Sequence, residues 1–255
     1  YGRITVDVSE SNDSIAYVIA NQERDGDHYL WKYKYKTEDG VGINGVWTDL
    51  SQNLPNGFRS QGGYDLYVRI NPYDHTKVYL GGVNAYYSET GFETSSSRKI
   101  GGSGVSNHHA DQHEVVFIDS NTFLSTHDGG ISLSKDTVSN IIQWEAINNG
   151  YVTSQFYQVA IDRSGTIPDL ITGGTQDNGN YETVSSDPSK PWDVQPGGGD
   201  GAYHTVSNSG KLIVVSRQYG NSFIADLNNP FGWNYSQYAG TRWEEHSWAY
   251  MYPPG

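Results

Sequence analysis

The 255-residue sequence contains no cysteine and only one methionine, Met251. Without cysteine the chain can form neither a disulfide framework nor a thiolate site, so its sequence carries no sign of the redox state of its compartment. No apolar run approaches the ~20 residues that a membrane-spanning helix needs, and no basic-then-apolar leader opens the chain. We therefore expect no transmembrane segment. Because the chain opens at Tyr1 inside a strand-like segment, we also expect it to be an incomplete portion of a longer protein.

Positive charge is scarce. The sequence has 16 Lys and Arg residues against 29 Asp and Glu residues, which gives a formal net charge of −13. Such a surface repels a phosphate backbone and an anionic membrane, so we expect no nucleic-acid partner. Cations, sugars and basic protein surfaces are the ligand classes that fit this charge.

Helical periodicity is nearly absent, and a β-type unit recurs in its place. Each copy has an alternating apolar strand, a short polar turn, an aliphatic strand that often ends in Gly-Gly, and a Ser/Asp/Gly turn. One such unit cannot bury its own apolar face, so several copies must pack side by side. The spacing of ~40–60 residues is typical of a four-stranded propeller blade. The copies start near Ile4, Asp65, Glu114, Tyr157 and Ala202.

These repeats predict an all-β fold of the β-propeller class, with four-stranded blades. Residues 1–255 contain about five blades or part-blades by this count, and we predict that they form one propeller domain. Rings of this kind commonly have more blades, so we expect further blades or domains of the same protein to complete the ring.

A first polar cluster lies in Asn107–His113, where His109, Asp111 and His113 alternate. In an extended strand such residues point to one side. Imidazole and carboxylate groups can ligate a transition metal or orient a hydrolytic water, but they can also line an inner strand and bind one another. The second interpretation is favoured, because ligands roughly 6–7 Å apart converge poorly on a tetrahedral site. We expect these side chains to be hydrogen-bonded to the Asp/Gly turns.

Three Asp/Gly turns form the other polar clusters. Glycine permits positive φ and an Asx side chain bonds nearby backbone, so these turns form without any ligand. With the blades in register, their aspartates would gather at one face, where carboxylates suit Ca²⁺ or acid/base work on a glycoside. The predicted metal ligands are Asp128, Asp177 and Asp200; the predicted ligand-binding residues are His109, Asp111, His113, Gln176, Asp177 and Asn178; the candidate catalytic residues are Asp111 and Asp200.

The order of several motifs resembles that of a known family. The motifs are Val46–Pro55, Gln61–Tyr67, Val78–Val83, His109–His113, His127–Asp136, Gln155–Tyr157, Gly174–Gly179 and Gly198–Gly201. They resemble the large secreted propellers with Asp-box (bacterial neuraminidase, BNR) repeats, similar to sortilin-type and xyloglucanase-type propellers and to surface proteins that Bacteroidetes export by the type IX system. The resemblance implies a secreted or cell-surface propeller. The Asp box itself is met only in part, by Ser134-Lys-Asp136 and the later Trp144.

Two functions are compatible with this resemblance. Our leading hypothesis is a module that binds a glycan or an extracellular protein without catalysis of its own. The alternative is a glycoside hydrolase of the xyloglucanase type, which uses two aspartates on different blades. The two differ in one property, because a hydrolase needs two carboxyl groups roughly 5–9.5 Å apart in an open cleft, one of them with a raised pKa.

Overall fold

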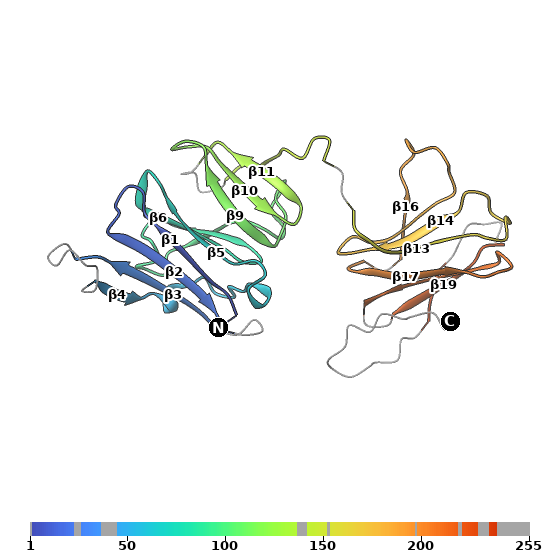
Figure 1. The fold of residues 1–255 in the computed structure, drawn as a ribbon, viewed down its shortest axis with the longest axis horizontal. Helices are drawn as coiled ribbons and strands as arrows, with labels where there is room; N and C mark the ends of the chain where they lie inside the picture. Colours follow the sequence, from blue (N-terminus) through green and yellow to red (C-terminus); the bar gives the residue numbers. More distant parts are fainter. Residues whose placement is uncertain are drawn as a thin grey trace. The chain divides into compact units, whose positions relative to one another are not determined.

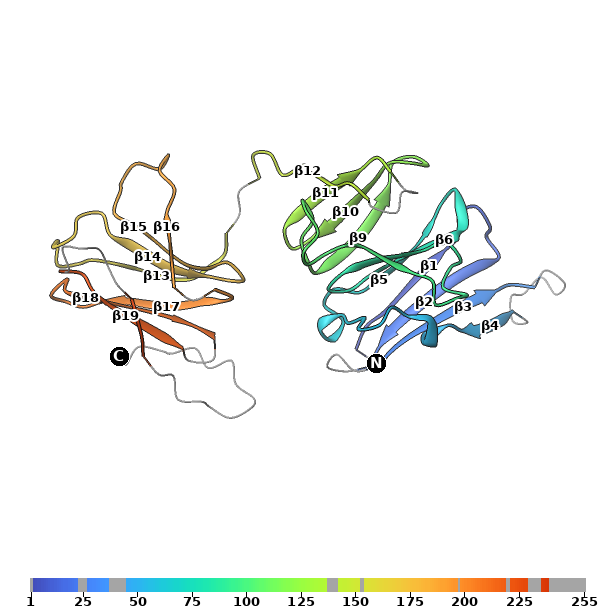
Figure 2. The same ribbon diagram turned by 180° about the vertical axis from the view of Figure 1, so that it is seen from behind.

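The computed structural model describes residues 2–22, 27–36, 45–136, 142–151, 154–196, 198–218, 221–228 and 235–238. The strands form five antiparallel four-stranded sheets, and each sheet takes four strands that are consecutive in the chain (Figures 1 and 2). This is the blade arrangement of a β-propeller, so the predicted fold class is confirmed. The helices in this part of the chain are single turns, η1 (Ser51–Asn53) and η2 (Gln61–Gly63). No helix among the described residues has the length and apolar character that crossing a membrane requires.

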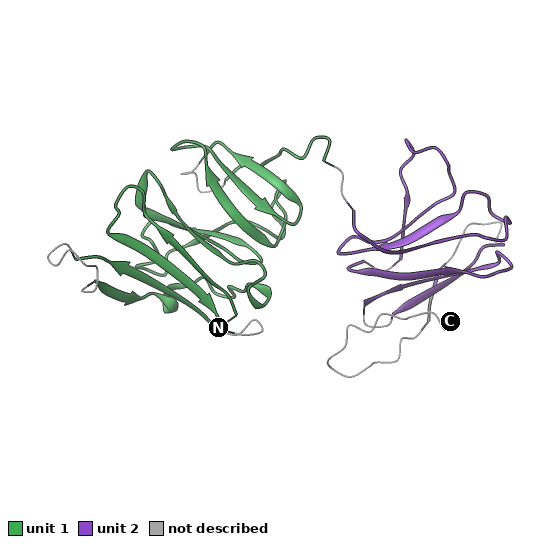
Figure 3. Cartoon of the chain, viewed as in Figure 1, with its two compact units in different colours: residues 1–151 green, residues 152–255 purple. Residues whose placement is uncertain are grey.

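The chain divides into two compact units, residues 1–151 and residues 152–255 (Figure 3). Unit 1 holds three blades. Blade A consists of β1 (Ile4–Val8), β2 (Ile15–Asn21), β3 (His28–Lys34) and β4 (Val46–Asp49). Blade B consists of β5 (Tyr67–Asn71), β6 (Asp74–Gly81), β7 (Ala85–Ser88) and β8 (Arg98–Gly101). Blade C consists of β9 (Gln112–Phe117), β10 (Phe123–His127), β11 (Gly130–Ser134) and β12 (Glu145–Ala146).

Unit 2 holds two blades. Blade D consists of β13 (Phe156–Ile161), β14 (Ile171–Thr175), β15 (Gly179–Thr183) and β16 (Asp193–Gln195). Blade E consists of β17 (Gly201–Val206), β18 (Leu212–Arg217), β19 (Ser222–Asp226) and β20 (Ser236–Tyr238). The first strand of every blade begins within two residues of the start that the repeat predicts. Within unit 1, β1 lies beside β5 and β5 beside β9, and within unit 2, β13 lies beside β17, as the innermost strands of neighbouring blades do.

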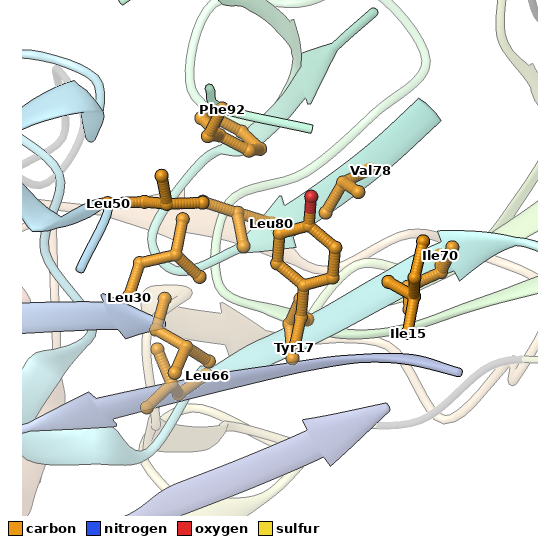
Figure 4. Packing of buried hydrophobic residues seen from close by; sticks show 11 residues of the cluster. Ile15, Tyr17, Leu30, Leu50, Leu66, Ile70, Val78, Leu80 and Phe92 are labelled. Carbon is orange, nitrogen blue, oxygen red and sulfur yellow. The ribbon is translucent and has the colours of Figure 1, made fainter. Parts of the chain in front are cut away.

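The core between blades A and B explains the apolar alternation of their strands. Ile15, Tyr17 and Ile19 alternate along β2, and all are nearly inaccessible to solvent. They belong to one cluster with residues of β5 and β6, which Figure 4 shows from close by. The hydroxyl of Tyr17 donates to the carbonyl oxygen of Gly91 at 2.9 Å, which satisfies the one polar atom of this buried side chain. Full burial of each such side chain stabilises the fold by about 1.5–3 kcal/mol.

Aromatic side chains dominate the core between blades B and C. The rings of Tyr79 and Phe123 lie 5.6 Å apart, and the ring of Phe123 meets that of Trp144 edge-on at 5.2 Å. The indole Nε1 of Trp144 donates to the carbonyl oxygen of Ile100 at 2.7 Å. This bond ties the segment before β12 to β8 of the neighbouring blade. A smaller apolar core in unit 2 is built from Leu170, Ile213, Val215, Ala225 and Leu227.

Polar side chains also join the inner strands of neighbouring blades. Asp7 Oδ2 on β1 accepts a hydrogen bond from the backbone N–H of Ile70 on β5 at 2.7 Å. Gln158 Oε1 on β13 accepts from the backbone N–H of His204 on β17, also at 2.7 Å. In both units, therefore, a side-chain oxygen of one inner strand accepts a hydrogen bond from a backbone N–H of the inner strand of the next blade.

Candidate functional site

Three segments of unit 1 supply side chains to one polar site: the loop before β5, the start of β9 and the turn between β10 and β11. The loop before β5 contains η2, and Gln61, Gly62 and Gly63 all have positive φ. Arg3 fixes this loop, because its Nη1 donates to the carbonyl oxygens of Gly63 at 3.1 Å and Tyr64 at 2.7 Å. The loop is thereby tied to blade A while its side chains meet those of blade C.

Asp128 joins two aromatic residues at the surface of this site. Its Oδ1 accepts a hydrogen bond from the hydroxyl of Tyr64 at 3.0 Å and another from Nε2 of His113 at 2.6 Å. The two rings meet edge-on with their centroids 5.2 Å apart. The side chain of Tyr64 is nevertheless 54% exposed. The arrangement presents a fixed aromatic ring to solvent, flanked by a carboxylate and an imidazole.

Beneath this surface lies a pair of carboxyl groups, Asp65 and Asp111. Gln61 Nε2 donates to Asp111 Oδ1 at 2.6 Å and reaches Asp65 Oδ2 at 3.5 Å. Asp65 is 0% exposed, and its Oδ1 has no hydrogen-bond partner in the described part of the chain. Burial raises the pKa of Asp65 to about 7, and the nearby charge of Asp111 adds to the increase. Burial and the charge of Asp128 also raise the pKa of Asp111, so the pair retains a proton far above the usual range of a carboxyl group.

His109, Asp111 and His113 of the first polar cluster do not share one side of a strand. Strand β9 begins at Gln112, so His109 and Asp111 lie in the turn before it, and only His113 belongs to the strand. Asp111 takes a left-handed backbone conformation, with φ of 62°, while its N–H donates to the carbonyl oxygen of Val83 at 3.0 Å. This bond holds the turn against blade B and brings the Asp111 carboxyl to Gln61. The expected bond to an Asp/Gly turn is present for His113, through Asp128.

Two further histidines are buried behind the site. Burial lowers the pKa of His127 to about 4 and that of His108 to about 3, so both are neutral at physiological pH. His127 Nε2 lies 2.8 Å from Ser132 Oγ, and Ser132 Oγ donates to the carbonyl oxygen of Asn107 at 2.7 Å. His127 therefore donates through Nε2 and supports the turn that carries Asp128.

In unit 2 the structure brings Asp177 and Asp200 together. The N–H of Asp177, a residue with φ of 59°, donates to Asp200 Oδ1 at 2.9 Å, and Asp200 is only 7% exposed. The side chains of Gln176, Asp177 and Asn178 are exposed, and Asn178 Nδ2 donates to the carbonyl oxygen of Gln176 at 3.0 Å. Asp200 thus holds the turn in place, and the turn presents its amide and carboxylate groups to solvent.

Calcium binding by Asp128, Asp177 and Asp200 stays a prediction. Asp128 belongs to unit 1, whereas Asp177 and Asp200 belong to unit 2. Among the described residues, no three His, Asp or Glu side chains are grouped so that they could hold a metal ion.

Sequence reasoning identified Asp111, His113 and Asp128 but missed Gln61, Tyr64 and Asp65 as site residues. Gln61–Tyr67 was used as a family motif and Asp65 as the start of a repeat copy, but none of the three was named as a site residue. A usable signal was their place in the repeat, because Asp65, Asp111 and Asp200 all lie within two residues of the start of an inner strand. An aspartate therefore closely precedes the inner strand in three of the five blades, by two residues at β5 and by one residue at β9 and β17.

Comparison with known proteins finds similarity among solved structures. A scan against protein-family models finds no match, and a search of curated proteins finds none either. Among solved structures, the chain is similar to a GH74 enzyme of Niastella koreensis, NkGH74, with a TM-score of 0.48 and 12% sequence identity. The similarity covers 90% of this chain and 41% of that chain, so this chain spans about two fifths of the length of that enzyme.

Proposed function

We propose that this chain is a glycan-binding propeller module without catalysis of its own, and that Tyr64 is the centre of its sugar site. The exposed ring of Tyr64, held by Asp128, supports this proposal. Sugars present an apolar C–H face that stacks on an aromatic ring, and hydroxyl groups that bond carboxylate, amide and imidazole groups. Gln61, His113 and Asp128 supply such groups around Tyr64. We place the protein outside the cell or on its surface, in keeping with the family resemblance.

The hydrogen bonds and the burial of the carboxyl groups in unit 1 favour glycan binding over glycoside hydrolysis. A hydrolase needs one carboxyl group at the glycosidic oxygen and a second at the anomeric carbon. In unit 1, Asp111 is bonded to Gln61, Asp128 is bonded to both Tyr64 and His113, and Asp65 is inaccessible to solvent. These bonds hold side chains in place, as a preformed binding surface requires.

The Tyr64→Ala substitution is expected to abolish measurable oligosaccharide binding, because it removes the stacking surface. Titration calorimetry with xyloglucan and mixed-linkage β-glucan oligosaccharides measures this. Tyr73→Ala is the matched control, since Tyr73 is 55% exposed and follows β5 whereas Tyr64 precedes it. Equal loss of affinity in the two variants, or unchanged affinity in Tyr64→Ala, would contradict the assignment of the site.

The hydrolase remains the second candidate function because of one observation. The pKa of Asp65 is about 7, and Asp65 lies beside a second carboxyl group, that of Asp111. A carboxyl group with such a pKa can act as a general acid. If the binding proposal is correct, the purified chain releases no reducing sugar from either glucan. Release of sugar that is lost in Asp111→Asn or Asp200→Asn would establish the hydrolase instead.

A further inference from the structure

A cavity of about 410 Å³ lies at the other end of the inner strands of unit 1. Its lining includes Asp7, Val8, Glu10, Arg69, Tyr73 and Val116, which come from β1, β5, β9 and the segments that follow β1 and β5. Tyr64 precedes β5 and Tyr73 follows it, so the cavity is separate from the proposed sugar site. The proposed glycan binding therefore makes no use of this cavity.

The charge of this cavity is negative, because its arginine is already neutralised. The Arg69 guanidinium donates through Nη1 to Asp7 Oδ1 at 3.0 Å, and through Nε and Nη2 to the two carboxylate oxygens of Glu114, each at 2.6 Å. The other oxygen of Asp7 accepts the Ile70 N–H. Two carboxylates thus compensate one guanidinium, and an anionic ligand would find no free positive charge on Arg69.

Glu10 also lines this cavity, and its carboxylate does not pair with Arg69. Its side chain is exposed, and it takes part in no ion pair among the described residues. It therefore keeps its full capacity to accept hydrogen bonds from a cation.

Apolar side chains share the lining of the cavity with Glu10. Val8 is 54% exposed, Tyr73 is 55% exposed and Val116 is 48% exposed, and all three line the cavity. Apolar surface next to an uncompensated carboxylate suits a ligand that is apolar and positively charged at once. The ring of Tyr73 adds a surface that attracts a cation.

We propose that this cavity binds an amino group carried on an apolar peptide segment, with Glu10 as its acceptor. The amino group is either the N-terminus of the peptide or a lysine side chain, since both offer an ammonium group next to apolar side chains. The net charge of −13 supports the assignment, because it attracts a basic partner at long range.

Three synthetic peptides test this proposal by titration calorimetry on the purified chain. Acetyl-Leu-Lys-Leu-amide carries only a lysine ammonium, Leu-Leu-amide carries only an N-terminal ammonium, and acetyl-Leu-Gln-Leu-amide carries no charge. At least one charged peptide is expected to bind and the neutral peptide is not, and the peptide that binds identifies the source of the amino group.

Glu10→Gln is expected to lower the affinity of the binding peptide about tenfold, the usual effect of losing one charge-assisted hydrogen bond. Glu145→Gln, which changes an exposed carboxylate on β12 outside the cavity, and Tyr64→Ala are expected to leave it unchanged. The proposal is overturned if neither charged peptide binds, if the neutral peptide binds equally well, or if Glu10→Gln has no effect.

Discussion

Replacing Asp65 by asparagine is expected to make the protein more stable at alkaline pH, by roughly 4 kcal/mol at about pH 8. The reason is that Asp65 is 0% exposed and burial raises its pKa to about 7, whereas in the unfolded chain its pKa is near 3.8. Above neutral pH the wild-type protein must hold a buried carboxylate beside Asp111. Asparagine has a similar shape and carries no charge, so it avoids this cost.

The sign follows from the direction of the shift. A carboxyl group with a raised pKa binds its proton more tightly in the folded protein, so it adds stability below the unfolded pKa and loses it as the pH rises towards 7. The stability gap between Asp65→Asn and wild type is therefore expected to grow between about pH 5 and about pH 8, measured by urea unfolding followed by circular dichroism. A stability gap that does not change over this range would contradict the raised pKa of the buried Asp65 carboxyl group.

Asp74→Asn is the control for this measurement. Hydrogen bonds from Thr76 lower the pKa of Asp74, so its contribution to stability is lost only as the pH falls below about 4. Its stability difference from wild type is expected to stay constant from about pH 5 to about pH 8. A parallel drift in both variants would point to a general charge effect instead of the Asp65 pair.

Gly174→Ala is expected to destabilise unit 2 by about 3 kcal/mol or to prevent its folding. A Cβ atom at this position would lie 2.3 Å from the carbonyl oxygen of Ala202, 2.4 Å from its nitrogen and 2.5 Å from the carbonyl carbon of Gly201. These are backbone atoms of β17, the inner strand of the next blade, and they can move aside only if the two blades separate. The expected result is a lower urea midpoint for the transition of unit 2.

Gly198→Ala is the matched control, because a Cβ at Gly198 would meet no atom within 4 Å. This substitution is expected to leave the free energy of unfolding within about 0.5 kcal/mol of wild type, and the urea midpoint therefore nearly unchanged. If Gly174→Ala unfolds at the same midpoint as Gly198→Ala, the close approach of blades D and E is wrong.

The sequence pattern was sufficient to predict the fold. It did not explain why particular positions of the strands are occupied by glycine. Period-two alternation located the first strand of each blade, since every blade must bury a face against its neighbour. The repeat places Gly-Gly pairs at the ends of aliphatic strands, but it does not explain why glycine is needed there. In the structure Gly174 lies within β14, and it is small because the neighbouring inner strand passes directly over it. A contact between residues far apart in the sequence leaves no periodic signal in either segment.

The site was predicted only in part, for a related reason. His113 and Asp128 come from paired strands and their turn, so the repeat places them near each other. Asp111 departs from the expected alternation because its φ of 62° takes it out of the extended conformation. Gln61 and Tyr64 reach the site through η2, whose run of positive φ values no alternation describes. Backbone conformations of this kind depend on tertiary contacts such as those of Arg3, and periodicity cannot predict them.

Hydroxyl-radical footprinting with and without a bound xyloglucan oligosaccharide tests the proposed sugar site most directly. Tyr64 and Tyr73 are 54% and 55% exposed, so radicals reach the two rings equally in the free protein. The proposal predicts that the oligosaccharide slows the oxidation of Tyr64 and leaves that of Tyr73 unchanged. Binding of the oligosaccharide with no protection of Tyr64 would contradict it.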